Sequence, residues 1–102
     1  NTGKNVAKKE MQENFLRVNK EAAEEIARQL RLRNLSGMVL VDFINLTSKS
    51  AEEELLKTFR AALQKDPVPA QLIDMTALGL VEVTRKKIKR PLHEIFPDGL
   101  GF

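Results

Sequence analysis

The clearest periodic pattern in the chain is an apolar stripe in its first third. Between positions 15 and 30, apolar side chains recur at intervals of three, four and seven residues, which is typical of one face of an amphipathic helix. The pattern predicts a helix over residues 15–33, ended by Asn34 and Gly37. Before it, the opening NTGKNVAKKE is polar, and we expect it to be turn-like and to be the cut end of a longer protein.

A second apolar segment, VLVDFINL at residues 39–46, contains a single carboxylate. Residues 38–44 are nearly all apolar and several are β-branched, which predicts an interior strand covered on both faces. Asp42 lies in the middle of this predicted strand. Because a carboxylate removed from water is unfavourable unless it is paired, hydrogen-bonded or bound to a metal, we expect Asp42 to have a partner.

The second half of the chain predicts one more helix and two strands. Ser50 and Glu53 have the spacing of a capping box before an apolar stripe, so a helix is expected over residues 51–65. Residues 71–75 and 80–85 have the composition of short strands separated by a glycine turn. The order helix, strand, helix, strand, strand predicts an α/β fold with a short mixed sheet and two main helices.

Length and composition limit the chain to one small domain. It has 102 residues, of which 42% are hydrophobic and 30% charged, and this balance is that of a soluble globular protein. The net charge of +3 is compatible with an anionic partner such as nucleic acid but does not require one. We predict a domain over residues 1–90 and a C-terminal arm over residues 91–102, which is either irregular or docks through Ile95 and Phe96.

Cysteine content and hydropathy exclude several classes of protein. The chain has no cysteine, which excludes a disulfide framework and a thiolate zinc site, and a single histidine, which offers no catalytic triad. No apolar run approaches the roughly 20 residues of a membrane span, and no signal-peptide pattern is present. The sequence therefore predicts a soluble, cytoplasmic protein that is not associated with a membrane.

Asp42 and Asn45 are the first candidates for chemistry. Both lie near the end of the predicted central strand, where open α/β sheets place ligands because the carboxyl ends of strands face a crevice between loops. Two alternatives for Asp42 need no ligand, since its carboxylate would cap the next loop or pair with an arginine of the first helix. For Asn45, turn chemistry at the boundary between strand and loop is a sufficient explanation.

A set of basic side chains is the second candidate. Such residues can follow the phosphate backbone of RNA through charge and counterion release. Cations also favour the negative end of a helix dipole, and a charged run is usually a solvated surface, so both explanations stay open. The six residues are Arg28, Arg31, Arg33, Arg85, Lys86 and Lys87.

Two segments of the chain resemble the ribonuclease E/G family. Residues 21–46 read EAAEEIARQLRLRNLSGMVLVDFINL, similar to the family's IARQLRLR helix end and the IDFID-type strand that follows it. Residues 79–87 read GLVEVTRKK and resemble the family's GL(L/V)EM(S/T)R segment at the expected distance. The resemblance covers residues 1–90.

The resemblance implies a magnesium-dependent endoribonuclease that cuts single-stranded RNA, with this chain as the DNase I-like catalytic subdomain of a larger protein. Asp42 then corresponds to one of the two aspartates that hold the catalytic Mg²⁺. The other stands in an Asp-x-Asn motif whose Asn matches Asn1, so Asn1 would orient the metal-binding carboxylates and the partner aspartate would precede this chain. The isolated fragment is therefore expected to be inactive, and a homo-oligomer formed through the parent protein stays open.

The chemistry of Mg²⁺ agrees with this implied site. Mg²⁺ takes one or two protein carboxylates together with waters and substrate phosphate oxygens, and it activates water without a histidine base. The sequence departs from the family where a second strand-end aspartate is replaced by Asn45, and where residues 66–71 read DPVPAQ instead of a basic segment. Sensing of a 5′-monophosphate end is therefore not expected from that segment. Zinc-joined assembly is not assigned either, because the family's zinc-link cysteines have no counterpart through Phe102.

Two other functions stay open from the sequence. One is a non-catalytic RNA-binding or scaffold module with a degenerate site, which would bind RNA without cleaving it. The other is a structural α/β domain whose basic side chains serve only solubility.

Overall fold

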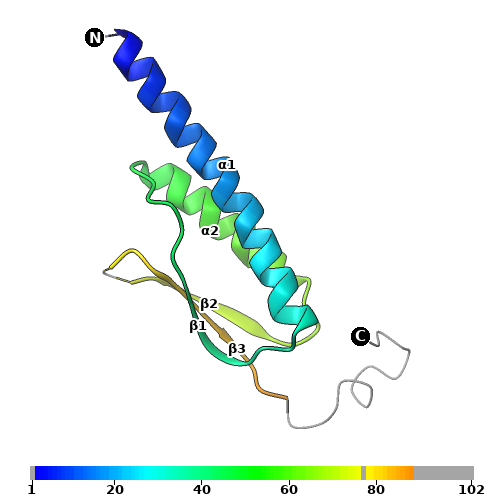
Figure 1. The fold of residues 1–102 in the computed structure, drawn as a ribbon. Coiled ribbons are helices and arrows are strands. Elements are labelled where there is room, and N and C mark those ends of the chain that lie inside the picture. Colours follow the sequence, from blue (N-terminus) through cyan, green and yellow to red (C-terminus); the bar gives the residue numbers. More distant parts are fainter. Residues whose placement is uncertain (1, 77, 89–102) are drawn as a thin grey trace.

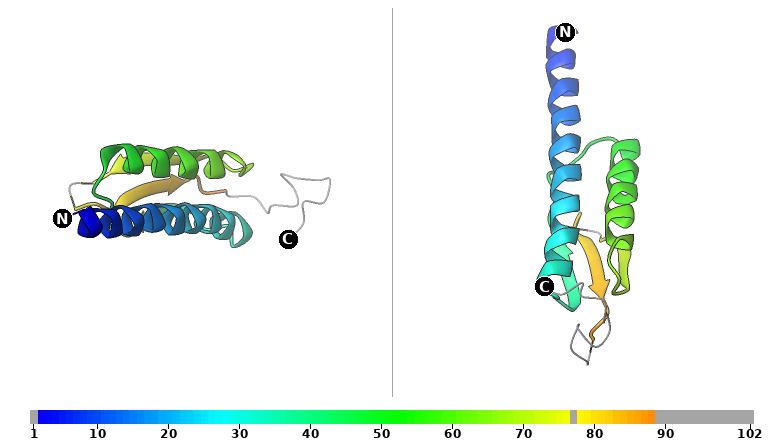
Figure 2. Two further views of the ribbon diagram at one scale, coloured as in Figure 1. Left: turned by 90° about the horizontal axis from the view of Figure 1, so that it is seen from above. Right: turned by 90° about the vertical axis from the view of Figure 1, so that its right-hand side faces the viewer.

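The computed structural model describes residues 2–76 and 78–88 and shows two layers, one of helices and one of strands. Two helices lie alongside each other over one face of a three-stranded sheet (Figure 1). Seen from above in Figure 2, α1 and α2 run side by side and the strands appear between them in projection. The predicted α/β fold with two main helices is confirmed. In chain order the elements are α1 (Thr2–Leu32), β1 (Gly37–Val41), α2 (Lys49–Gln64), β2 (Ala70–Met75) and β3 (Val81–Arg85).

The sheet has the strand order β1-β3-β2, and both pairings among the described residues are antiparallel. The sequence predicted a short mixed sheet. The connection between β2 and β3 is too short for a parallel crossover, so these strands form a hairpin, and β1 then pairs antiparallel with β3. In this register Gly37 pairs with Arg85 and Val41 pairs with Val81. Arg85 therefore lies at one end of the sheet, and the residues after Val41 lie at the other.

The core lies between β3 and the two helices. Side chains alternate along β3, and Val81 and Val83 are fully buried beneath the helices. From α2, Phe59 and Leu55 fill the space above them. The stripe predicted for the first helix supplies the rest, where its small side chains allow close approach. Its buried members are Ala23, Ala27 and Leu30.

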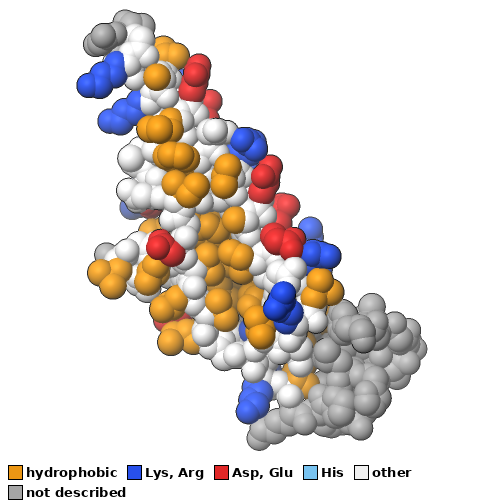
Figure 3. Space-filling model, in the orientation of Figure 1, with side chains coloured by type: hydrophobic (Ala, Val, Ile, Leu, Met, Phe, Trp, Pro, Cys, Tyr) orange, Lys and Arg blue, Asp and Glu red, His pale blue; other side chains and the backbone are white. Residues whose placement is uncertain are grey.

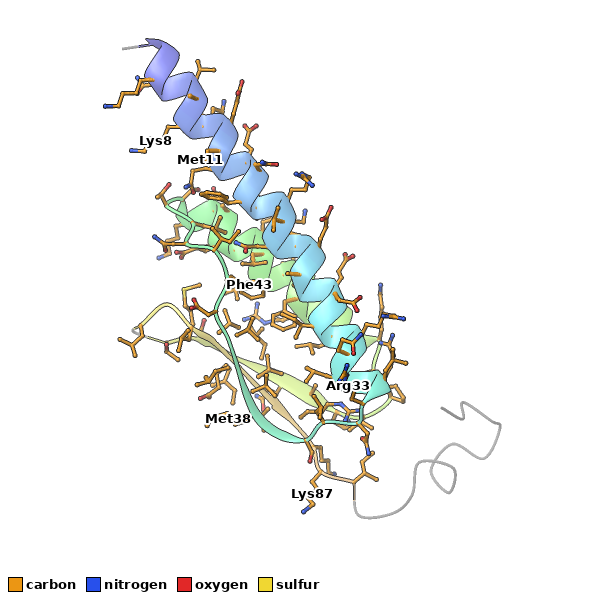
Figure 4. All side chains as sticks on the ribbon, in the orientation of Figure 1. Lys8, Met11, Arg33, Met38, Phe43 and Lys87 are labelled. Carbon is orange, nitrogen blue, oxygen red and sulfur yellow. The ribbon has the colours of Figure 1, made fainter. Side chains whose placement is uncertain are left out.

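The opposite face of the sheet carries exposed apolar side chains. Met38 and Leu40 of β1 are 64% and 51% exposed, and Ile73 of β2 is 43% exposed. In Figure 4 the side chain of Met38 points away from the helices. The prediction of an interior strand covered on both faces over residues 38–44 is wrong, because β1 is an edge strand that ends at Val41 and no second layer covers it in the described chain.

Helix α1 is longer than predicted at its N-terminus and ends where predicted. Residues 2–10, expected to be turn-like, are helical, and they consist largely of good helix formers without proline. This part of α1 extends beyond α2 and the sheet (Figures 1 and 2). At the other end Asn34 adopts a left-handed conformation, with φ of 50°, and the amide of Leu35 donates to the carbonyl of Leu30 over 3.1 Å.

Helix α2 agrees with the predicted span of residues 51–65, but a different serine begins it. The N-cap is Ser48, whose hydroxyl accepts a hydrogen bond from the amide of Ala51 over 3.3 Å. The capping box predicted from Ser50 and Glu53 is therefore wrong. In the part of the chain that the structure describes, neither helix has an apolar stretch long enough to cross a bilayer. The predicted arm over residues 91–102 lies outside the described residues.

Candidate metal site

In the loop after β1, residues 42–46, Phe43 and Leu46 pack inward, whereas Asp42, Ile44 and Asn45 are exposed. Val41 and Leu46 at its two ends are 8% and 5% exposed. Phe43 packs edge-on against Phe59 of α2, with ring centroids 5.6 Å apart and an interplanar angle of 87°. Because neighbouring side chains of an extended segment point in opposite directions, these inward anchors direct Asp42 outward.

Asn19 of α1 holds the same loop through its backbone. Its side-chain amide donates to the carbonyl oxygen of Ile44 over 2.8 Å, and its side-chain oxygen accepts from the amide of Ile44 over 2.9 Å. The side-chain oxygen of Gln12 also accepts from the amide of Thr47 over 3.0 Å. Asn19 is only 2% exposed, so its hydrogen bonds form in a largely dry environment. The loop that presents Asp42 is therefore fixed to α1 at two points.

Asp42 is exposed, and its carboxylate has no hydrogen bond or ion pair within the described residues. The expectation that it is buried within a strand is wrong. Its charge therefore needs no protein partner, because water solvates it. The two alternatives without a ligand also fail for the described residues, since this carboxylate neither caps the next loop nor pairs with an arginine. Asn45 is exposed on the same loop and likewise makes no side-chain hydrogen bond there.

A hollow of about 170 Å³ lies beside the loop, and we call it the Asp42 hollow. Asp42 and Asn45 line it from the loop, and Glu52 lines it from the first turn of α2. Its apolar wall comes from Leu55 of α2 and from the turn between β2 and β3. In Figure 3, hydrophobic side chains gather along α1 and over the neighbouring part of the molecule. The hollow is thus a small, partly apolar space with three oxygen-bearing side chains on its walls.

The donors of the Asp42 hollow fit Mg²⁺ in type and number. They are two carboxylates and one amide oxygen, all hard ligands, and none of the described lining residues is a histidine. Among the described residues no group of three or more histidine, cysteine, aspartate or glutamate side chains is gathered for a metal. Mg²⁺ does not require such a group, because it usually binds one or two carboxylates and completes its coordination with water and phosphate. The hollow has room for several waters.

Asn1, predicted to orient the metal-binding carboxylates, lies outside the described residues. Its neighbour Thr2 begins α1, whereas the Asp42 loop contacts the helix at Asn19. At about 1.5 Å per residue, helix geometry puts roughly 25 Å between Thr2 and Asn19. From Asn19 towards Thr2, the described part of α1 therefore leads away from the Asp42 hollow.

Most of the predicted RNA-binding residues gather at the other end of the sheet. Figure 4 shows Arg33, from the end of α1, and Lys87, after β3, at the same end of the molecule. Lys86 and Lys87 are exposed, and Arg31 is half-buried in the last turn of α1. β1 spans about 15 Å between this end and Asp42. The structure thus separates the basic group from the candidate metal ligand.

Two of the predicted RNA-binding arginines already have partners on α1. Arg28 forms an ion pair with Glu25 over 3.0 Å, and Arg33 donates to the side-chain oxygen of Gln29 over 2.8 Å. The pKa of Glu25 is lowered, chiefly because the amide of Gln29 donates a hydrogen bond to its carboxylate; the charge of Arg28 acts in the same direction. These pairs are exposed and weak, so they leave both guanidinium groups accessible to an anion.

Arg85 has an internal position that does not suit contact with RNA. Its guanidinium is 1% exposed and forms a two-bond pair with Asp66, from Nε to Oδ2 over 2.7 Å and from Nη2 to Oδ1 over 3.2 Å. Its Nη1 donates to the side-chain oxygen of Asn34 and to the carbonyl oxygen of Leu35. The group joins the ends of both helices to β3. We therefore correct its predicted role from RNA contact to structural anchor.

Sequence reasoning did not single out Asn19, Asp66 or Glu52. Asn19 interrupts the apolar stripe of α1 at a position that faces the core, which is a signal that was present in the periodicity. Asp66 was noted only as the first residue of the DPVPAQ segment. Glu52 belongs to a run of three glutamates, and only the fold shows that it faces the Asp42 hollow.

Comparisons with known proteins identify the family of this chain. The model of the ribonuclease E/G family matches residues 1–88. The chain is 46% identical over 86 residues to ribonuclease E of Nostoc sp. (strain PCC 7120), an alignment that covers 84% of this chain and 12% of that protein. It is 38% identical over 95 residues to ribonuclease G of Escherichia coli (strain K12), covering 93% of this chain and 19% of that protein. The chain thus spans less than a fifth of the length of either relative, and it belongs to the ribonuclease E/G family.

Proposed function

We propose that this chain is the metal-binding part of a magnesium-dependent endoribonuclease that cleaves single-stranded RNA in the cytoplasm. The observation that carries the proposal is the state of Asp42. Its carboxylate is exposed at the end of β1, lines a hollow with other oxygen donors, and has no partner among the described residues. This arrangement occurs within a segment that matches a ribonuclease family.

In such an enzyme, different groups of the described residues would bind the metal, position the loop and bind RNA. Bound Mg²⁺ would supply charge stabilisation for hydrolysis of the phosphodiester. Asp42 would hold the cation, while Asn19 and Phe43 keep the loop that presents it in place. Exposed basic side chains at the other end of the sheet, including Arg33 and Lys87, would hold the RNA backbone by charge.

A DNase I-like subdomain is our proposal for the architecture of the parent, and two helices over one face of a sheet are compatible with it. The isolated chain is proposed to be inactive because a second metal-binding aspartate is expected from elsewhere in the parent. If Asn1 orients the metal-binding carboxylates, it has to lie near Asp42. Because α1 runs about 25 Å away from Asn19 towards Thr2, the first turns of this helix would have to follow another path in the parent protein.

The test is Asp42→Asn in the full-length parent. Loss of a charged metal ligand is expected to lower magnesium-dependent RNA cleavage by at least a factor of about 100. Folding should be unchanged, because the carboxylate is exposed and has no partner. Asp74→Asn is the matched control, since Asp74 is also exposed but does not line the hollow, and asparagine tolerates its positive φ of 85°. Full activity of folded Asp42→Asn would refute the proposal.

A non-catalytic RNA-binding module is the second candidate. The observation that favours it is the accessible basic group at the end of the sheet away from Asp42, which would suffice for binding. If the wild-type parent binds RNA but cleaves none at any magnesium concentration, this function replaces the first.

A further inference from the structure

Glu52 places a second carboxylate on the Asp42 hollow. It belongs to the first turn of α2, is half-buried, and makes no side-chain hydrogen bond or ion pair within the described chain. Among the described residues, the lining of the hollow contains Asp42, Asn45 and Glu52 as its polar side chains and no lysine, arginine or histidine. Two negative groups therefore face one small space that the described protein does not neutralise.

Some carboxylates near the helices have a cationic partner within the chain, whereas others, such as Glu24 and Glu53, are unpaired among the described residues and exposed to water. Glu25 pairs with Arg28, Glu54 pairs with Lys20 over 2.8 Å, and Asp66 pairs with Arg85. The net charge of the chain is +3, so cationic side chains are not scarce. Glu52 differs from the exposed, unpaired glutamates because it is half-buried and borders the same hollow as Asp42, so the two carboxylates give this space a negative potential that favours a cation.

We infer that Glu52 is a second carboxylate ligand, directly or through one bound water, of the divalent cation that Asp42 holds. The inference rests on the proposed function and adds to it a residue from a different element of the fold. Two carboxylates with an amide oxygen and waters match the coordination that Mg²⁺ accepts. Glu52 also offsets the partial positive charge at the start of α2, which would otherwise repel a cation in the hollow.

A purely structural explanation of Glu52 exists, and the neighbouring residue separates it from the inference. A carboxylate near the start of a helix stabilises that helix through the dipole, whatever it faces. Glu53 is one position further along α2 and has the same charge, but it is exposed and does not line the hollow. Glu53→Gln therefore removes the same charge from the same part of the helix without touching the proposed site.

The experiment measures binding of Mn²⁺, as a probe for Mg²⁺, to the full-length parent by calorimetry without RNA. Glu52→Gln is expected to weaken Mn²⁺ binding by at least roughly tenfold, whereas Glu53→Gln should change it by less than about twofold. Asp42→Asn is measured in parallel and should remove the same binding event. Circular dichroism and thermal unfolding of each variant confirm that the fold is retained.

A rescue variant makes the test specific for ligation. Asn45 lines the same hollow, and Asn45→Asp adds a carboxylate there with almost no change in size. Introduced together with Glu52→Gln, it should restore Mn²⁺ affinity to within about threefold of wild type. A residue that only stabilises α2 would not be replaced by a carboxylate on the loop.

The outcomes separate the inference from the proposed function. If Asp42→Asn removes the binding event and Glu52→Gln leaves it unchanged, the role of Glu52 is overturned while the proposed function stands. Weakened binding in Glu52→Gln that Asn45→Asp does not restore would assign Glu52 to the helix alone and also overturn the inference. If Asp42→Asn binds Mn²⁺ as the wild type does, the proposed metal site fails and the inference with it.

Discussion

The two ends of the sheet treat charged side chains in opposite ways. Where Gly37 pairs with Arg85, the guanidinium is 1% exposed, and its Nε, Nη1 and Nη2 all donate to Asp66, Asn34 or Leu35. At the end that follows Val41, the carboxylate of Asp42 is exposed and has no partner among the described residues. One end thus contains a buried charge that has its counter-ion and four hydrogen bonds within the protein. The other end has an exposed charge that is solvated by water and is not paired within the described residues.

This contrast indicates which charged residues are available for function. A buried ion pair with most of its hydrogen bonds made is not accessible to a ligand, and removing one partner leaves an uncompensated charge. An exposed carboxylate that borders a hollow keeps most of its hydration when the protein folds, and it can bind a cation. The sequence-based interpretation had the two positions reversed, with Asp42 buried and Arg85 in contact with RNA.

The largest expected effect is the loss of stability in Asp66→Ala. It leaves the guanidinium of Arg85 buried without its counter-ion, which should cost about 3–5 kcal/mol of the free energy of unfolding. Domains of this size have total stabilities of roughly 5–15 kcal/mol, so the variant should be largely or partly unfolded at 37 °C. Urea denaturation of the chain, followed by circular dichroism, measures the difference.

Two control variants test whether the two ends of the sheet differ in this way. Asp42→Ala removes the same side chain from the other end of the sheet and should change stability by less than about 0.5 kcal/mol. The double variant Asp66→Leu with Arg85→Met should be more stable than Asp66→Ala, because no buried charge remains unpaired. Equal losses in Asp66→Ala and Asp42→Ala would contradict the distinction between the two ends.

Much of the fold was predictable because periodicity reports which side chains are buried. The α1 stripe, the α2 span and the two hairpin strands each follow from local pattern, and all were found within a few residues of the predicted bounds, apart from the N-terminal part of α1. The N-cap of α2 was misassigned to Ser50 because Ser48 and Ser50 offer the same hydroxyl two positions apart. Local composition does not decide between them.

The environment of each charge was not predictable in this way. An apolar run such as residues 38–44 fits an interior strand or an edge strand equally well, and only the strand order decides that Asp42 is exposed. The pairing of Arg85 with Asp66 joins residues nineteen positions apart through the hairpin, and that of Arg85 with Asn34 spans fifty-one. Glu52 became a candidate only because the loop and α2 border one hollow. Asp42 was first singled out by a burial argument that was wrong, and the family resemblance implied a metal-binding role for the same residue.

A smaller effect is expected from Asn19→Ala, which tests how the loop that carries Asp42 is held in place. The change leaves the amide and carbonyl of Ile44 without their partner on α1 and should cost about 1–3 kcal/mol of stability. Mn²⁺ binding by the parent should weaken as well, because the loop that presents Asp42 is no longer fixed. Asn14→Ala on the exposed side of α1 is the control and should have little effect on either quantity. A stable variant with normal Mn²⁺ binding would show that the Asn19 contact does not position the site.

The smallest expected effect concerns the exposed cations at the Arg85 end of the sheet. If Arg33 and Lys87 contact the RNA backbone, replacing either with alanine in the parent should reduce the slope of log affinity against log salt by about 0.7, the value for one phosphate contact on a single strand. Lys57→Ala on the exposed side of α2 is the control and should leave the slope unchanged. Asp42→Asn should abolish cleavage but keep the wild-type slope, because a metal ligand contributes to catalysis rather than to counterion release. Unchanged slopes in both Arg33→Ala and Lys87→Ala would mean that the exposed cations of this end are only solvated, and that the two ends differ in structure but not in their use of RNA.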